Sequence, residues 1–237
     1  MLKIKFTAVL LIAFLLQVNA QEFLTPSYTF SHKKTSYVTL KDGTEKKGTL
    51  SDIDIKKGLI KKITIVDDAT GKKLKLKAQD VSSMYLVPSG FDKLTKATSF
   101  LKDAQKWNND KLNQDFLSQG YVYFENSNVK IKKKVLPMLM QLLNPDFSNH
   151  VKVYHDPMAK QTASVGIGGV TLAGGDAKSY YVKIEGESTA YLLTRKDYKK
   201  EFKPFWTKCP AVTEKFTDAK WTDLPKHIVE YTETCGK

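Results

Sequence analysis

Regular alternation of apolar and charged residues restricts the first third of this chain to antiparallel β structure. In residues 73–77, two leucines alternate with three lysines, and a strand with this pattern buries its leucines and exposes its lysines. Upstream, Asp42-Gly43 separates two short apolar runs, which indicates a hairpin. We therefore predict a small antiparallel β unit over residues 28–88, ended by Pro88-Ser89-Gly90.

The turns of this unit resemble those of small SH3-like or Sm-like barrels. The resemblance rests on Val38-Thr39-Leu40-Lys41-Asp42-Gly43-Thr44, on Gly48-Thr49-Leu50, on the turn at Gly71 and on a last strand entered by Asp80-Val81. It implies a barrel shape only, because the residues with which Sm-like proteins contact RNA are not matched here.

Helices and short strands are predicted beyond the β unit. Residues 91–118 place their apolar side chains near one stripe, which predicts a linking helix that ends before Gly120. Residues 119–237 are expected to form an α+β domain with a C-terminal helical tail. Within this domain, we expect a helix in the apolar segment 135–143 that begins near Pro137. A strand followed by a turn is the alternative. The predicted fold class of the whole chain is therefore α+β.

The two cysteines predict a disulfide. Each lies on the apolar stripe of its own short helix, Cys209 with Val212 and Phe216, and Cys235 with Leu224, Ile228 and Tyr231. No Cys-x-x-Cys spacing is present, so a redox-active pair is not favoured. We expect the helical tail to be stapled by a bond between Cys209 and Cys235.

Aromatic residues mark the core expected around this tail. One helix is predicted to bury Tyr198, Phe202 and Phe205, and the tryptophans Trp107, Trp206 and Trp221 are expected to be core anchors. His227 lies off the apolar stripe of the last helix, so it is expected at the surface, as is His32.

Residues 180–236 resemble secreted proteins of Gram-negative Bacteroidota. The resemblance is carried by Lys196-Asp197-Tyr198-Lys199-Lys200-Glu201-Phe202, by Cys209-Pro210 and by Val229-Glu230-Tyr231 with Cys235. It implies a place outside the cytoplasm and this layout, and it implies no activity.

The first twenty residues predict export. Lys3 and Lys5 precede an apolar run over Phe6–Leu16, and Val18-Asn19-Ala20 supplies small residues for a cleavage site. The apolar run is shorter than the roughly 20 residues that a membrane span needs. We expect residues 1–20 to be a signal peptide, and the chain from Gln21 to be periplasmic or secreted without a transmembrane span.

Positive charge comes almost entirely from lysine. The formal net charge is +13, and among the 38 basic residues Arg195 is the only arginine. Proteins that read bases favour the planar guanidinium group, so specific nucleic-acid binding is not expected. A lysine-rich surface can instead attract acidic glycans or anionic membrane surfaces, or can simply be solvated. An envelope protein is a further possible partner.

The densest polar cluster does not match a metal site. His150 and His155 flank the predicted strand Val151–Tyr154, and their odd separation places them on opposite faces. Zinc ligands on one element share a face, so we predict neither a metal nor another cofactor. A hydrolase that uses His155 and Asp156 as an acid–base pair remains an alternative.

A glycine-rich segment over residues 165–176 fits neither a dinucleotide fingerprint nor a phosphate loop. We expect an exposed loop, whose Val, Ile and Leu residues would serve a contact with a partner, a ligand or a membrane surface. The candidate binding residues are therefore Gly166, Gly168, Gly169, Gly174 and Gly175 of this segment, with Lys73, Lys75 and Lys77 of the β unit.

These observations favour an exported, non-catalytic binding or interaction protein of the bacterial envelope. No catalytic residue is assigned. The alternatives are the hydrolase named above and a structural subunit of an envelope assembly, which would form a stable oligomer.

Overall fold

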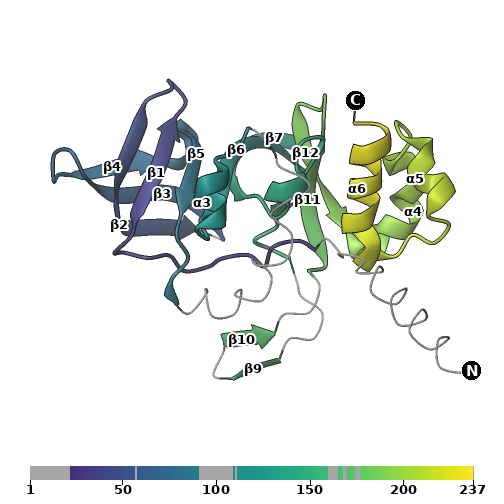
Figure 1. The fold of residues 1–237 in the computed structure, drawn as a ribbon, viewed down its shortest axis with the longest axis horizontal. Helices are drawn as coiled ribbons and strands as arrows, with labels where there is room; N and C mark the ends of the chain where they lie inside the picture. Colours follow the sequence, from purple (N-terminus) through teal and green to yellow (C-terminus); the bar gives the residue numbers. More distant parts are fainter. Residues whose placement is uncertain are drawn as a thin grey trace, which may run out of the picture.

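A computed structural model describes residues 22–56, 58–90, 109, 111–159, 165–167, 170–173 and 177–236. In these ranges the chain forms a ten-stranded sheet, a separate two-stranded ribbon and a group of C-terminal helices (Figure 1). The predicted α+β class is confirmed. None of the described helices is long and apolar enough to cross a membrane.

The N-terminal strands form antiparallel pairs in the order β4-β3-β2-β1-β5. Their bounds are β1 Thr35–Leu40, β2 Glu45–Lys56, β3 Leu59–Asp67, β4 Lys73–Lys77 and β5 Val81–Leu86, with a 3-10 turn, η2, at Ala78–Asp80. Gly43 and Gly71 have positive φ angles of 85° and 66° at two of the hairpin turns, where an L side chain would be strained. Among the described strands, β4 pairs with β3 alone and is therefore an edge strand.

The sheet continues without interruption into β6 (Val122–Ile131) and β7 (Lys134–Gln141). The prediction of a helix that begins near Pro137 is wrong, and the alternative prediction of a strand is confirmed. Pro137 lies inside β7 opposite Asn128 of β6. Proline lacks the N–H of a ladder hydrogen bond and is tolerated here because β7 pairs along its length with β6 only.

A ring of strands follows the first barrel-like unit. Its members β8 (Val151–His155), β11 (Ser179–Ile184) and β12 (Thr189–Thr194) continue the order β6-β12-β11-β8, and β12 runs parallel to β6. A 3-10 turn, η3 (Pro145–Phe147), precedes β8. Leu142, just after β7, forms a bridge with Tyr154 of β8, so that the ring closes beside β1–β5 (Figure 1).

Strand β6 supplies side chains to two cores. Val122 and Phe124 pack in the cluster of β1–β5, whereas Val129 packs in the cluster inside the ring, with Tyr123 against it. Successive side chains of a strand point to opposite faces, so one strand can line both cores. The predicted β unit over residues 28–88 is thus completed by side chains from the region that follows it.

The helices are α3 Gln114–Ser118, α4 Arg195–Phe205, α5 Pro210–Lys215 and α6 Leu224–Thr234, with a 3-10 turn, η4, at Trp221–Asp223. Of the predicted linking helix over residues 91–118, the structure describes Asn109 and residues 111–118, and α3 lies at its end. Asn113 caps α3, because its Oδ1 accepts a hydrogen bond of 3.0 Å from the Phe116 N–H. The rest of that helix and Trp107 lie outside the described residues.

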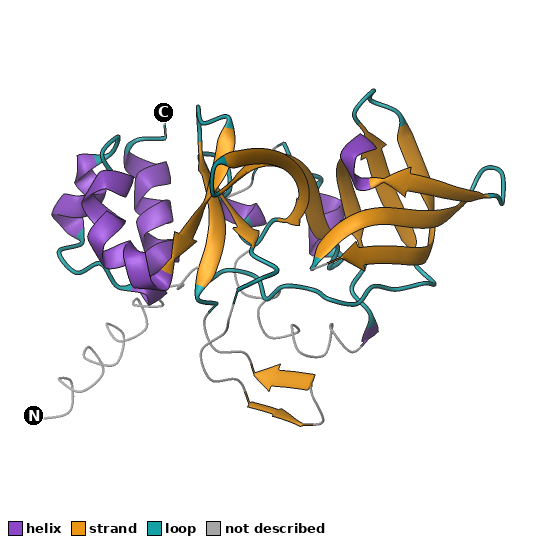
Figure 2. Cartoon of the chain, turned by 180° about the vertical axis from the view of Figure 1, so that it is seen from behind, coloured by secondary structure: helices purple, strands orange, loops and turns teal. Residues whose placement is uncertain are grey.

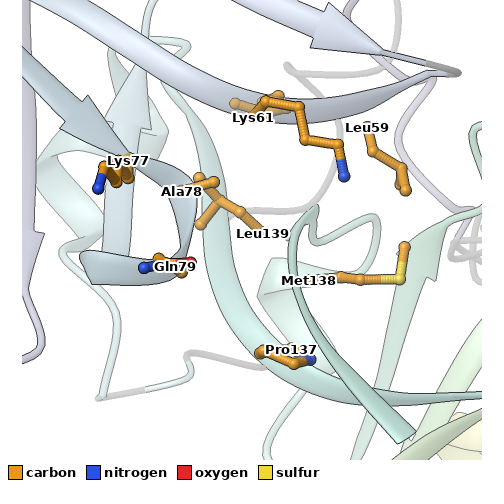
Figure 3. A pocket seen from close by; sticks show the side chains of 9 residues that line it. Leu59, Lys61, Lys77, Ala78, Gln79, Pro137, Met138 and Leu139 are labelled. Carbon is orange, nitrogen blue, oxygen red and sulfur yellow. The ribbon is translucent and has the colours of Figure 1, made fainter. Parts of the chain in front are cut away.

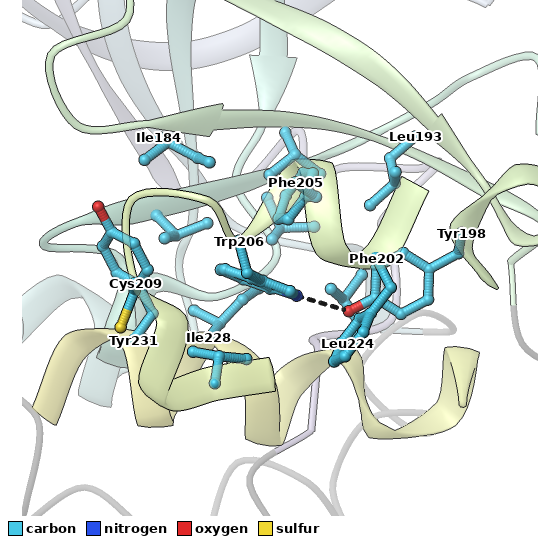
Figure 4. Close-up of a cluster of buried hydrophobic side chains, with 14 of the residues drawn as sticks. Ile184, Leu193, Tyr198, Phe202, Phe205, Trp206, Cys209, Leu224, Ile228 and Tyr231 are labelled. Carbon is cyan, nitrogen blue, oxygen red and sulfur yellow. Dashed lines mark hydrogen bonds between the residues drawn. The ribbon is translucent and has the colours of Figure 1, made fainter. Parts of the chain in front are cut away.

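The C-terminal helices pack on β8, β11 and β12 around an aromatic core (Figure 4). Tyr198, Phe202 and Phe205 are buried on α4 as predicted, and Trp206 and Trp221 are buried with them. Cys209, just before α5, and Cys235, just after α6, form the predicted disulfide, with their Cα atoms 5.8 Å apart.

His227 is not at the surface, and that prediction was wrong. Its side chain on α6 is fully buried, and its Nδ1 lies 2.7 Å from the Tyr198 hydroxyl. His227 follows Leu224 by three residues and precedes Tyr231 by four, a spacing that places all three on one face of α6. The rings of Tyr198, Phe202 and Trp206 pack against its imidazole, and Phe216 packs edge-on against it. The surface prediction failed because a histidine was left out of a buried face to which its spacing assigns it.

The glycine-rich segment contains two short strands rather than a loop alone. β9 (Val165–Ile167) and β10 (Val170–Ala173) form an antiparallel ribbon that is separate from the large sheet (Figure 2). Gly166 pairs with Thr171 in this ribbon. Gly168, Gly169, Gly174 and Gly175 lie outside the described residues, as do residues 1–20 with the predicted signal peptide.

Candidate functional site

The edge strand β4 presents a row of lysines to solvent. Lys73, Lys75 and Lys77 are exposed, while Leu74 and Leu76 are partly buried against the core of β1–β5. The alternation expected from the sequence is therefore confirmed. Within the described residues, none of the three lysines takes part in an ion pair. Their charge is free to act on a partner.

The hairpin of β3 and β4 is strongly basic around this row. Residues 56–77 hold eight lysines and two aspartates. Lys62 of β3 lies directly opposite Lys77, and Asp54 of β2 lies on the other side of Lys62. We call Lys62, Lys73, Lys75 and Lys77 the basic hairpin face.

The aspartate at the tip of this hairpin is used by the turn. Asp67 Oδ1 accepts hydrogen bonds of 2.8 Å from both the N–H and the hydroxyl of Thr70. The bond from the hydroxyl is the main reason why the pKa of Asp67 is lowered from its ordinary value. A carboxylate held in this way fixes the turn, and among the described ion pairs it has none with Lys73, Lys75 or Lys77.

Backbone groups of β4 are also available along its free edge. The Asp67 N–H donates to the Lys72 carbonyl over 2.9 Å, which makes these two residues a hydrogen-bonded pair. Such pairs alternate along an antiparallel ladder. The backbone groups of Leu74 and Leu76 therefore form hydrogen bonds with β3, and the alternate residues of β4 direct their N–H and C=O groups outward. The three residues with outward backbone groups are the same three lysines.

A pocket of about 230 Å³ lies between the end of this strand and β7 (Figure 3). Its walls come from the start of β3, the end of β4 with η2, and the middle of β7. The lining residues are Leu59, Ile60, Lys61, Lys77, Ala78, Gln79, Pro137, Met138 and Leu139. The pocket therefore combines an apolar interior with two lysines, and Lys77 belongs both to it and to the basic hairpin face.

Sequence reasoning found the lysine row but missed the pocket. Lys61 and Lys62 are visible in the sequence as part of the basic hairpin. The opposite wall was hidden, because residues 135–143 were expected to begin a helix and instead form β7 next to η2 and β3. The residue pattern of β7 shows no clear alternation that would have revealed it.

A second polar cluster joins Glu125 of β6 to β8. Both carboxylate oxygens of Glu125 accept hydrogen bonds from Lys152 Nζ, at 2.8 and 2.9 Å, and the Tyr154 hydroxyl donates to Oε1 over 2.5 Å. Burial and the nearby carboxylate raise the pKa of Tyr154 well above its ordinary value. The carboxylate is therefore held in place across the ring by two partners from β8.

Replacing Glu125 by Ala is expected to lower the free energy of unfolding by about 2 kcal/mol, because the buried Tyr154 hydroxyl loses its acceptor. The matched variant Glu125→Gln keeps an acceptor oxygen and should lose less. Urea unfolding at neutral pH measures both values. Equal stability of Glu125→Ala and the wild type would show that this cluster does not stabilise the ring.

The pair His155 and Asp156 shows local structural contacts. Asp156 is buried, its Oδ2 accepts from the Ser179 hydroxyl at 2.6 Å, and its Oδ1 accepts from the Met158 N–H at 2.9 Å. The His155 ring packs edge-on against Tyr28. Asp156 therefore ties the end of β8 to β11, and both of its oxygens have partners.

Known proteins add no further guide to the site. Within the described residues, no group of three or more His, Cys, Asp or Glu side chains could hold a metal ion. No protein-family model, no curated protein and no solved structure matches the chain. The case for a function therefore rests on the basic hairpin face and the pocket beside it.

Proposed function

We propose that this chain is an exported, non-catalytic binding protein of the bacterial envelope that holds an acidic partner on its basic hairpin face. The observation that carries this proposal is the row Lys73, Lys75 and Lys77, exposed at alternate positions of an edge strand. A cluster of like charges raises the local potential and attracts an oppositely charged partner more than isolated lysines would.

The disulfide supports the exported location. Cys209 and Cys235 are bonded, and structural disulfides persist in the periplasm and outside the cell, whereas they are rare in the reducing cytosol. The bond is compatible with the signal peptide expected in residues 1–20.

The contacts of the candidate acids support a non-catalytic role. Glu125 is held by Lys152 and Tyr154, and Asp156 is held by Ser179 and the backbone of Met158. A general acid or base must reach the proton of a substrate, and these carboxylates are instead occupied by groups of the fold.

Charge reversal tests the proposed surface. The triple variant Lys73→Glu, Lys75→Glu and Lys77→Glu is expected to weaken binding of soluble polyglutamate by about tenfold or more at low salt. Binding by the wild type should itself fall steeply as salt is added, because exposed charges are screened. Fluorescence anisotropy of labelled polyglutamate measures both effects.

A matched variant separates the site from net charge. Lys199, Lys200 and Lys203 on α4 are exposed and form no ion pair within the described part of the chain, so their replacement by Glu changes the net charge by the same amount. This control should bind polyglutamate nearly as the wild type does. Equal losses in the two variants would mean that total charge, and not the hairpin, governs binding.

A further inference from the structure

We infer that the acidic partner is an extended peptide segment, which adds as a strand to the free edge of β4 and places one apolar side chain in the pocket beside Lys77. This inference rests on the proposed function, since it names the chemistry of the partner held by the same lysines. It is carried by three features that meet at one end of the sheet: unpaired backbone, alternating charge and a small apolar pocket.

The backbone of β4 supplies the pairing groups. β4 is a terminal strand of the sheet order and, in the part of the chain that the structure describes, pairs only with β3. Its alternation leaves the N–H and C=O groups of Lys73, Lys75 and Lys77 directed to the free edge. An exposed edge of this kind accepts an extended peptide through main-chain hydrogen bonds, with specificity from the alternate side chains.

The side chains of β4 define what such a peptide must contain. Every second residue of an added strand lies on the same face as the lysines, and the residues between them lie on the face of Leu74 and Leu76. Opposite charges directly across a strand pair stabilise it, and like charges destabilise it. The partner sequence is therefore an alternation of acidic and apolar residues.

The pocket gives this peptide an anchor. At about 230 Å³ it is smaller than the roughly 300–1,000 Å³ of most small-molecule sites, and its size suits a side chain better than a whole ligand. Leu59, Met138 and Leu139 supply apolar walls, and Figure 3 shows Lys61 extending beside them. An apolar side chain buried next to two lysines suits a peptide whose neighbouring residues are acidic.

The same lysines disfavour a second copy of this chain as the added strand. Two β4 edges brought together would oppose lysine to lysine, which is a repulsive arrangement that natural edge strands use against self-pairing. The edge of β7 across the pocket is also a poor partner, because Pro137 lacks an N–H for pairing. These features make the β4 edge suited to an acidic peptide.

The test uses the whole chain from Gln21 and three kinds of short fluorescent peptide, the third of which is made in two forms. In the first, glutamate alternates with valine. The second has the same composition, with the glutamates grouped together. The third kind has the first sequence with backbone N-methyl groups on every second residue. It is made in two forms, one methylated at the glutamates and one at the valines. One of the two forms lacks the N–H groups that would face β4. We expect the first peptide to bind at least about tenfold more tightly than the second peptide. It should exceed the weaker of the two N-methylated forms by a similar factor.

A pair of protein variants provides a second measurement. Lys75→Ala removes one charge, and Lys75→Pro removes the same charge together with the outward N–H, which an edge strand tolerates. Thermal melting confirms folding of each variant. The alternating peptide should bind Lys75→Pro several-fold more weakly than Lys75→Ala, whereas polyglutamate should bind the two alike.

The possible outcomes separate this inference from the proposed function. Equal binding of the three peptides, with polyglutamate binding retained, would overturn strand addition and leave the basic hairpin face as a general acidic site. Tighter binding of dextran sulfate or anionic vesicles than of any peptide would likewise overturn the peptide assignment. Absence of binding to polyglutamate and to all peptides would overturn both proposals.

Discussion

Removing the bond between Cys209 and Cys235 is expected to lower the free energy of unfolding by about 3–4 kcal/mol, the chain-entropy value for a loop of this length. The bond joins the start of α5 to the end of α6, with 26 residues of sequence separation. The aromatic core of Figure 4 lies under these two helices, so their loosening would expose Trp206, Leu224 and Ile228.

Urea unfolding of the oxidised wild type, the reduced wild type and the variant Cys209→Ala with Cys235→Ala measures this effect. The single variant Cys235→Ala is the control, because it breaks the bond but keeps the fully buried Cys209 side chain. All three forms without the bond should lose similar stability. Identical unfolding midpoints with and without reductant would show that packing alone fixes the helices.

Acidification is expected to destabilise the protein through His227. Trp206 Nε1 donates to the Tyr198 hydroxyl over 3.2 Å, and that hydroxyl lies 2.7 Å from His227 Nδ1. The indole can only donate, so the Tyr198 oxygen accepts from it and its own proton is available to Nδ1. We assign His227 as neutral, with its proton on Nε2.

Burial disfavours the charged imidazole and lowers the pKa of His227 from 6.5 to about 4. The unfolded chain therefore takes up a proton below pH 6.5, while the folded chain does so only near pH 4. The contribution of neutral His227 to stability is complete above pH 6.5 and is lost as the pH falls to about 4. The linked loss is at most about 3 kcal/mol.

The variant His227→Asn tests this dependence. Its side-chain oxygen can replace the acceptor Nδ1, and it does not titrate over this range. Urea unfolding at intervals between pH 7 and pH 4 should give a steeper fall for the wild type than for the variant. If the free energy of unfolding falls equally with pH in both proteins, other groups cause the acid sensitivity. One such group is Asp223, which lies near His227 and accepts a hydrogen bond from Lys226.

Local patterns in the sequence were sufficient for elements whose side chains have one buried face. The alternation in residues 73–77 predicted β4, and the spacing of Tyr198, Phe202 and Phe205 predicted the buried face of α4. The disulfide followed from two apolar stripes. Each of these features is a short-range consequence of strand or helix periodicity.

Elements buried on more than one side were harder to predict. The four residues of β7 from Met138 to Gln141 are all buried, because both cores and the adjoining strands cover them, so period-two alternation is lost. His227 was misplaced for a different reason, since its spacing from Leu224 and Tyr231 puts it on the buried face of α6, where a titratable residue was not expected. The pocket at β4 depends on β7 and could not be predicted without it.

The double use of β6 has a consequence for how this architecture can be divided. Because β6 lines two cores, we expect the folding of each core to depend on the other, so that the barrel-like unit and the ring unfold as one cooperative block. A fragment that stops before β6 would lack Val122 and Phe124 and leave Met84 and Leu86 uncovered. We therefore expect a fragment that folds on its own to contain both the barrel-like unit and the ring, because neither core is complete without side chains from β6.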